Sequence, residues 1–163
     1  MIKSLLYFLR LIFLQRDLIF TMSVREIKTQ YVGSMLGFAW TLINPLIMIS
    51  VFWFVFSVGF KAQPLNNVPF VVWLTAGMAI WYFFADVVTG SADLIVRNPA
   101  LIKKTIFQSQ VLPVVKIISS LVNHFVFLLV LLALLIFQSM PFHLYYLQFF
   151  YYLFCTIVLA LGI

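Results

Sequence analysis

The sequence predicts an all-α integral membrane protein: an interfacial amphipathic helix near the N-terminus, followed by about four transmembrane helices. First, 65% of the 163 residues are hydrophobic and only 9% are charged, with a mean hydropathy of +1.16, far above the range of soluble domains. Second, long uncharged stretches alternate with short polar connections. Third, lysines and arginines gather in alternate connections, as in multi-pass membrane proteins. The single cysteine, Cys155, lies in an apolar run, which excludes a disulfide framework.

Residues 1–37 are expected to form a cytoplasmic interfacial region. Residues 1–17 have a basic start and an apolar middle, but Arg10 divides the apolar run and no small-residue cleavage site follows. A short interfacial helix is therefore favoured over a signal peptide. Ser23 and Glu26 have the spacing of a capping box, which predicts that a second helix begins at Ser23 and runs to Leu36.

This second helix is expected to lie in the headgroup plane, with its apolar stripe towards the lipid tails. The stripe recurs at steps of three and four residues and comprises Val24, Ile27, Tyr31 and Met35. Arg25 and Lys28 fall outside it, close to lipid phosphates. Arg25, Ile27, Lys28 and Tyr31 are therefore the candidate residues of the interfacial helix.

Four apolar stretches predict membrane spans, at residues 38–60, 68–88, 114–137 and 145–163. Pro45 in the first span is expected to kink the helix without ending it. Asp86 is expected to mark the far end of the second span, and Lys116 to extend from the start of the third towards the headgroups. Because the fourth stretch is still uncharged at Ile163, we expect the chain to stop inside this span or at its very end, and to be the N-terminal part of a longer protein.

The connection over residues 89–113 is the longest. Asn98 and Pro99 form a helix-start signal, which predicts a short helix from Ala100 to Ser109 that Pro113 ends. The connection is either a solvated loop whose charges only set topology, or a docking element for a cytoplasmic partner. The docking interpretation assigns the contact to Arg97, Asn98, Pro99, Leu101, Ile102, Lys103 and Lys104.

The distribution of cations predicts the orientation. Residues 1–37 contain five lysines and arginines and residues 86–116 contain four, whereas the other two connections contain only Lys61. The positive-inside rule therefore places the N-terminus and the 89–113 connection in the cytoplasm. In a membrane protein this accounts for the net charge of +6 without a nucleic-acid partner.

No catalytic residues are predicted, and the chain is not expected to be an enzyme. It contains no phosphate-binding loop, and neither His124 nor His143 has a carboxylate or cysteine at metal-ligand spacing. Asn123 and His124 form a polar patch inside the third span, one turn after two serines. They either line a translocation path or form hydrogen bonds between helices, and the second interpretation is favoured. Aromatic residues near the two outer connections either anchor the bundle at the interface or stack on sugar rings.

Three runs of sequence resemble the permeases of ABC transporters that export bacterial polysaccharides. They are REIKTQYVGSMLGFAWTLINPLIMISVFWFVF (residues 25–56), PFVVWLTAGMAIWYFF (69–84) and NPALIKKTIFQSQVLPVVKIISSLVNHFVFLLVLLALLI (98–136). Together they comprise 87 of the 163 residues and extend from residue 25 to residue 136. Gln108 departs from the family pattern, which usually has proline after the phenylalanine.

The resemblance implies a subunit with six transmembrane helices, of which this chain holds about four. Two copies would form a channel in the bacterial cytoplasmic membrane, in contact with membrane lipids. Separate ATPase subunits would bind ATP and Mg²⁺, so this chain itself needs no cofactor. The substrate would be a lipid-linked polysaccharide of the O-antigen, capsule or teichoic acid type. The interfacial helix and the 89–113 connection would transmit ATP-driven closure. Two alternatives remain: a permease that exports a drug or a lipid, and a membrane scaffold that transports nothing.

Overall fold

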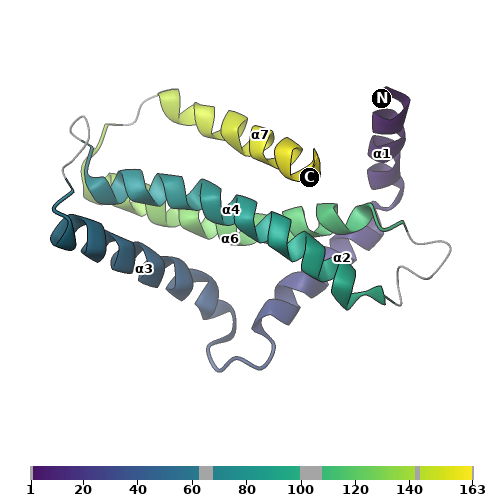
Figure 1. Cartoon of the computed structure of the whole chain (residues 1–163), viewed down its shortest axis with the longest axis horizontal. Coiled ribbons are helices and arrows are strands. Elements are labelled where there is room, and N and C mark those ends of the chain that lie inside the picture. The colour runs from purple at the N-terminus through teal and green to yellow at the C-terminus, as the bar shows by residue number, and fades with distance from the viewer. Residues whose placement is uncertain (1, 63–67, 100–107, 142–143, 163) are drawn as a thin grey trace.

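The structure is a computed structural model that describes residues 2–62, 68–99, 108–141 and 144–162. The regular elements of this part of the chain are helices (Figure 1), which confirms the all-α class. In order they are α1 (Ile2–Leu14), α2 (Arg16–Tyr31), the 3-10 turn η1 (Gly37–Ala39), α3 (Trp40–Trp53), the π-helical η2 (Phe54–Gly59), α4 (Phe70–Arg97), α6 (Val111–Phe137), the 3-10 turn η3 (Leu144–Leu147) and α7 (Gln148–Gly162).

Four helical segments are long and apolar enough to cross a membrane: Gly37–Gly59, Phe70–Arg97, Val111–Phe137 and Leu144–Gly162. They coincide with the four predicted spans, and the chain is a multi-pass membrane protein. Few of the apolar side chains in the first and fourth segments are buried within the protein. Much of their apolar surface is therefore left uncovered by the described part of the chain.

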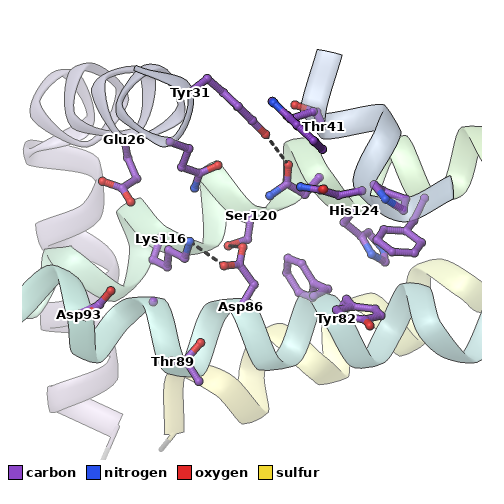
Figure 2. Close-up of a pocket in the computed structure, with 18 of the residues that line it drawn as sticks. Glu26, Tyr31, Thr41, Tyr82, Asp86, Thr89, Asp93, Lys116, Ser120 and His124 are labelled. Atoms are coloured by element: carbon purple, nitrogen blue, oxygen red, sulfur yellow. Dashed lines mark hydrogen bonds and ion pairs between the residues drawn. The ribbon is translucent and has the colours of Figure 1, made fainter. Parts of the chain in front are cut away.

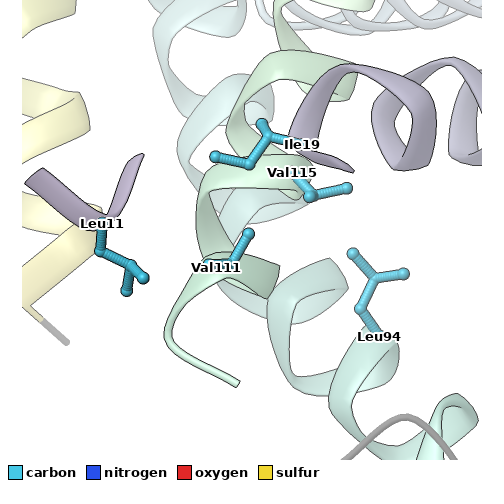
Figure 3. Close-up of a cluster of buried hydrophobic side chains, with 5 residues drawn as sticks. All are labelled: Leu11, Ile19, Leu94, Val111 and Val115. Atoms are coloured by element: carbon cyan, nitrogen blue, oxygen red, sulfur yellow. The ribbon is translucent and has the colours of Figure 1, made fainter. Parts of the chain in front are cut away.

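Helices α4 and α6 run side by side through the middle of the molecule, with α3 along one side and α7 along the other (Figure 1). Helices α1 and α2 lie at the end where α4 finishes and α6 begins. One buried apolar cluster joins these elements there (Figure 3); its members are Leu11, Ile19, Leu94, Val111 and Val115. The N-terminal helices therefore pack on both segments that flank the connection between α4 and α6.

The predicted start of the second helix is wrong. Helix α2 begins at Arg16, so Ser23 lies in its interior, where its hydroxyl donates to the Ile19 carbonyl at 2.8 Å. The same hydroxyl lies 3.3 Å from the Val115 carbonyl of α6. The S-x-x-E spacing also occurs inside helices, where a serine can bond to the carbonyl four residues earlier. Ser23 is thus a packing residue that lets α2 approach α6 closely.

The predicted end of this helix is also wrong. Helix α2 finishes at Tyr31, not at Leu36, and Met35 is fully exposed in the turn that follows. Gly33 and Gly37 have φ angles of +85° and +51°, which glycine adopts more readily than other residues. These two positions turn the chain from α2 into the first span.

Helix α4 is longer than predicted, because it continues through Asp86 to Arg97. Asn98 caps its C-terminal end, and the Asn98 side-chain amide donates to the Leu94 carbonyl at 2.9 Å. Pro113 does not end a helix as predicted. It lies in the first turn of α6, where a backbone amide would have no partner within the helix. The predicted helix over Ala100–Ser109 falls largely outside the described residues, as do Leu101, Ile102, Lys103 and Lys104.

Candidate functional site

A cavity of about 880 Å³ lies between α2, α3, α4 and α6 (Figure 2). Most of the side chains that line it are polar or charged. They include Glu26, Gln30, Tyr31, Thr41, Asn44, Asp86, Thr89, Asp93, Arg97, Lys116, Ser120, Asn123 and His124. The chain has four acidic residues in all, and three of them (Glu26, Asp86 and Asp93) line this cavity. Since polar side chains at membrane depth are costly, their concentration here marks the cavity as the candidate site.

An ion pair joins α6 to α4 at the wall of the cavity. The Lys116 ammonium lies 2.8 Å from one Asp86 carboxylate oxygen, and the Ser120 hydroxyl donates to the other at 2.6 Å. The Lys116 side chain is only 5% exposed, whereas the Asp86 side chain is 36% exposed. Lys116 therefore does not extend to the headgroups as predicted. It points inward, because Asp86 compensates its charge.

Gly90 makes the approach of Lys116 possible. A Cβ atom at position 90 would lie 2.0 Å from Lys116 Cε and 2.8 Å from Lys116 Nζ. The lysine side chain thus crosses the surface of α4 through space that any other residue at position 90 would occupy. Asp86 precedes Gly90 by one helical turn and so lies on the same face of α4.

Two carboxylates on the other walls differ in their partners. Asp93 forms an ion pair with Arg97, one turn further along α4. Glu26 projects from α2 into the cavity (Figure 2) and makes no hydrogen bond or ion pair with the described residues. With both cations of the cavity paired to aspartates, Glu26 leaves it with one excess negative charge.

Asn123 connects α2 to α6. The Tyr31 hydroxyl donates to Asn123 Oδ1 at 3.2 Å, and the Tyr31 ring packs edge-on against Phe38, with 5.7 Å between ring centroids. A residue predicted for the interfacial helix and one predicted for the translocation path are therefore in direct contact. This contact fixes the last turn of α2 beside the cavity.

His124 is buried between helices. Its Nδ1 atom lies 3.0 Å from the Ala79 carbonyl of α4, and its ring stacks on Phe149 of α7, with 5.3 Å between centroids. Phe83 packs against it at 4.9 Å. The predicted hydrogen bonding between helices is present, and His124 also lines the cavity.

The remaining predicted residues lie in different places. Arg25 and Lys28 are exposed on α2, away from the cavity lining, and Ile27 is half-buried. Arg97 lines the cavity, Asn98 caps α4, and Pro99 is exposed. Sequence reasoning missed Glu26, Asp86, Gly90 and Lys116 as site residues. The sequence did contain a signal for two of them. Asp86 and Lys116 have opposite charges, and they lie in two long apolar helices that follow each other along the chain.

No family model matches the sequence. The chain is similar, however, to curated proteins named O-antigen export system permease protein RfbA. One from Myxococcus xanthus is 34% identical over 119 residues, which is 73% of this chain and 45% of the relative. Two from Klebsiella pneumoniae are 33% and 30% identical over 97 residues, which is 60% of this chain and 36% of each relative.

The matched region spans less than half the length of these relatives. It nevertheless covers most of this chain, which has four helices suited to membrane spans. The resemblance found in the sequence is thereby confirmed: over its aligned part, this chain is similar to permeases that are named for O-antigen export.

Proposed function

We propose that this chain is part of the permease subunit of an ATP-driven ABC exporter that moves a lipid-linked polysaccharide outward across the bacterial cytoplasmic membrane. The observation that carries the proposal is the similarity to three O-antigen export permeases over 97 to 119 residues. In this proposal two copies of the permease form the channel. ATP and Mg²⁺ bind to a separate ATPase subunit, and this chain carries no catalytic residue.

The packing at one end of the molecule supports a role for the connection between α4 and α6 in coupling. The last turns of α4 and the first turns of α6 pack in one cluster with α1 and α2, through Leu11, Ile19 and Leu94. The Gln108 side-chain amide also donates to the Tyr7 hydroxyl of α1 at 2.9 Å. A displacement of this connection by an ATPase would therefore move the N-terminal helices as well.

The proposed coupling residues are those predicted from the sequence: Arg97, Asn98, Pro99, Leu101, Ile102, Lys103 and Lys104. Of these, the structure describes Arg97, Asn98 and Pro99, which end α4 at the side of the molecule where α1 and α2 lie. This end would be cytoplasmic, since it holds most of the cations. Asn123 and His124 would contribute to the wall of the translocation path, because both line the cavity.

Complementation of a strain that lacks its own O-antigen permease tests the proposal. The complete protein, expressed with its partner ATPase, should restore glycan at the cell surface. Leu101→Asp combined with Ile102→Asp should abolish both export and co-purification of the ATPase, while membrane insertion persists. Leu101→Ile with Ile102→Leu is the matched control and should export normally.

Two outcomes would overturn parts of the proposal. Efflux of a drug or transfer of a phospholipid, without surface glycan, would assign the chain to the alternative class of exporters. If the aspartate variant still exports glycan and still binds the ATPase, the connection is a solvated loop whose charges only set the topology, and the docking interpretation is wrong.

A further inference from the structure

Two side chains place buried polar atoms at the cavity without a partner in the described part of the chain. Thr41 of α3 is 4% exposed and His124 of α6 is 3% exposed, and both line the cavity (Figure 2). Neither Thr41 Oγ1 nor His124 Nε2 has a hydrogen-bond partner. Buried polar atoms in folded proteins are almost always paired with protein or with water, so each of these atoms is open to a hydrogen bond from a molecule in the cavity.

The unpaired atoms indicate which chemical groups such a molecule must present. His124 Nδ1 faces the Ala79 carbonyl, which can only accept, so in the neutral ring Nδ1 carries the proton. Nε2 is then a bare acceptor. The Glu26 carboxylate, also without a partner, accepts as well. The cavity is therefore short of hydrogen-bond donors, which O–H groups of a ligand would supply.

The charges of the cavity disfavour an anion. The Lys116 ammonium is paired with Asp86, and the Arg97 guanidinium is paired with Asp93. Glu26 leaves an excess negative charge that a phosphate or carboxylate would meet at close range. Trp40 and Tyr82 also line the cavity and offer aromatic surface to C–H groups.

From these observations we propose that the cavity is a binding site for a neutral, hydroxyl-rich ligand, whose O–H groups pair with His124 Nε2, Thr41 Oγ1 and Glu26. A volume of about 880 Å³ accommodates a small ligand of this kind. Neutral groups with several hydroxyls occur both in a sugar unit of a glycan and in the glycerol of a lipid headgroup. For a sugar unit of a glycan the inference rests on the proposed function, because the same cavity is there assigned to the translocation path.

Saturation-transfer NMR on the complete protein in lipid nanodiscs tests the site without any transport step. The probes are a neutral methyl hexoside, the corresponding hexose 6-phosphate, and glycerol. The methyl hexoside should receive saturation from the protein, and the hexose 6-phosphate should receive less. A stronger signal from glycerol than from the methyl hexoside would assign the ligand to the lipid headgroup.

Thr41→Val removes the unpaired hydroxyl with little change of shape, so it should weaken the hexoside signal by about three- to tenfold, the value of one hydrogen bond. Its thermal midpoint should stay equal to or rise above that of the unmodified protein, because no internal hydrogen bond is lost. Thr75→Val is the matched control. Thr75 is fully buried in α4, its hydroxyl donates to the Val71 carbonyl at 2.7 Å, and it does not line the cavity.

Should Thr41→Val fail to insert, Glu26→Gln replaces it. This variant keeps the size of the side chain at a half-buried position and replaces one acceptor by a donor, so it should weaken the hexoside signal too. A hexoside signal that neither Thr41→Val nor Glu26→Gln reduces would overturn the proposal. Binding of the hexose 6-phosphate as strong as that of the methyl hexoside would also overturn the proposal. So would the absence of saturation transfer to every probe, since the cavity would then hold water only.

Discussion

The Lys116 ammonium lies 2.8 Å from an Asp86 carboxylate oxygen and thereby joins the two longest helices of the molecule. Ser120 holds the second oxygen of the same carboxylate. Asp86 is the seventeenth residue of α4 (86 − 70 + 1), which places it about 24 Å along the helix at roughly 1.5 Å per residue. The pair therefore lies well inside a helix that is long and apolar enough to cross a membrane, where an unpaired charge would be costly.

A double-mutant cycle measures this pair. Asp86→Asn leaves the Lys116 ammonium buried without a counter-charge and should destabilise the protein by about 1–3 kcal/mol. Lys116→Met should cost less, because the Asp86 side chain is partly exposed and can recruit water. The double variant should be more stable than Asp86→Asn alone. Unfolding of the purified protein in detergent gives these values, and additive single effects would show that the pair contributes no coupling.

Gly90→Ala should break the same ion pair without removing either charge. The new Cβ would overlap Lys116 Cε and force the lysine side chain off the surface of α4. The loss of stability should therefore resemble that of Lys116→Met, and Gly90→Ala should be nearly silent when Lys116 is already alanine, whose side chain ends at Cβ. Gly77→Ala is the control, since a Cβ there meets no atom within 4 Å. Equal effects of the two alanines would contradict the assignment of Gly90.

The structure changes the charge count that predicts the orientation. Of nine cations assigned to the cytoplasmic side, Lys116 is paired inside the bundle, so eight remain, against Lys61 on the other side. The positive-inside rule still predicts a cytoplasmic connection between α4 and α6. With Cys155 replaced by alanine, a cysteine at the exposed position Gln110 should be protected from an impermeant reagent in intact cells, and a cysteine at Ser139 should be labelled. The reverse pattern would invert the topology.

The spans could be predicted because lipid imposes a simple demand on sequence. Apolar stretches of about 20 residues are required, and each predicted stretch is a helix in the structure. The boundaries of the helices were harder to predict from the sequence. Helix α4 passes Asp86 because a carboxylate paired with Lys116 need not leave the membrane, and this pairing is invisible in a local stretch of sequence.

The cavity could be predicted only in part. The polar pair Asn123 and His124 pointed to it, because polar residues inside a span need partners. The partners Tyr31 and Ala79 are 92 and 45 residues away in the sequence, so only the packing of helices reveals them. The Ser23–Glu26 spacing was misleading because it is a local motif. It cannot act as a helix cap when the helix has already begun at Arg16.

Helix α2 allows a test of apolar against charged contacts. Ile27 is half-buried, whereas Arg25 is exposed. Burial of a large apolar side chain contributes roughly 1.5–3 kcal/mol when complete, and a cation near anionic headgroups contributes about 1 kcal/mol. Ile27→Asp should therefore impair export more than Arg25→Gln at equal protein level, and Ile27→Leu should be nearly silent. If Arg25→Gln impairs export more than Ile27→Asp does, α2 would instead contact the ATPase through its charged side chains.

Transport itself tests the central claim most directly. Inside-out membrane vesicles that contain the complete protein and its ATPase should accumulate lipid-linked polysaccharide in a form protected from external glycosidase. Accumulation should require ATP and should disappear when either subunit is absent. Vesicles with both subunits that protect no glycan in the presence of ATP, or that protect it equally without this protein, would contradict the assignment as a polysaccharide-export permease.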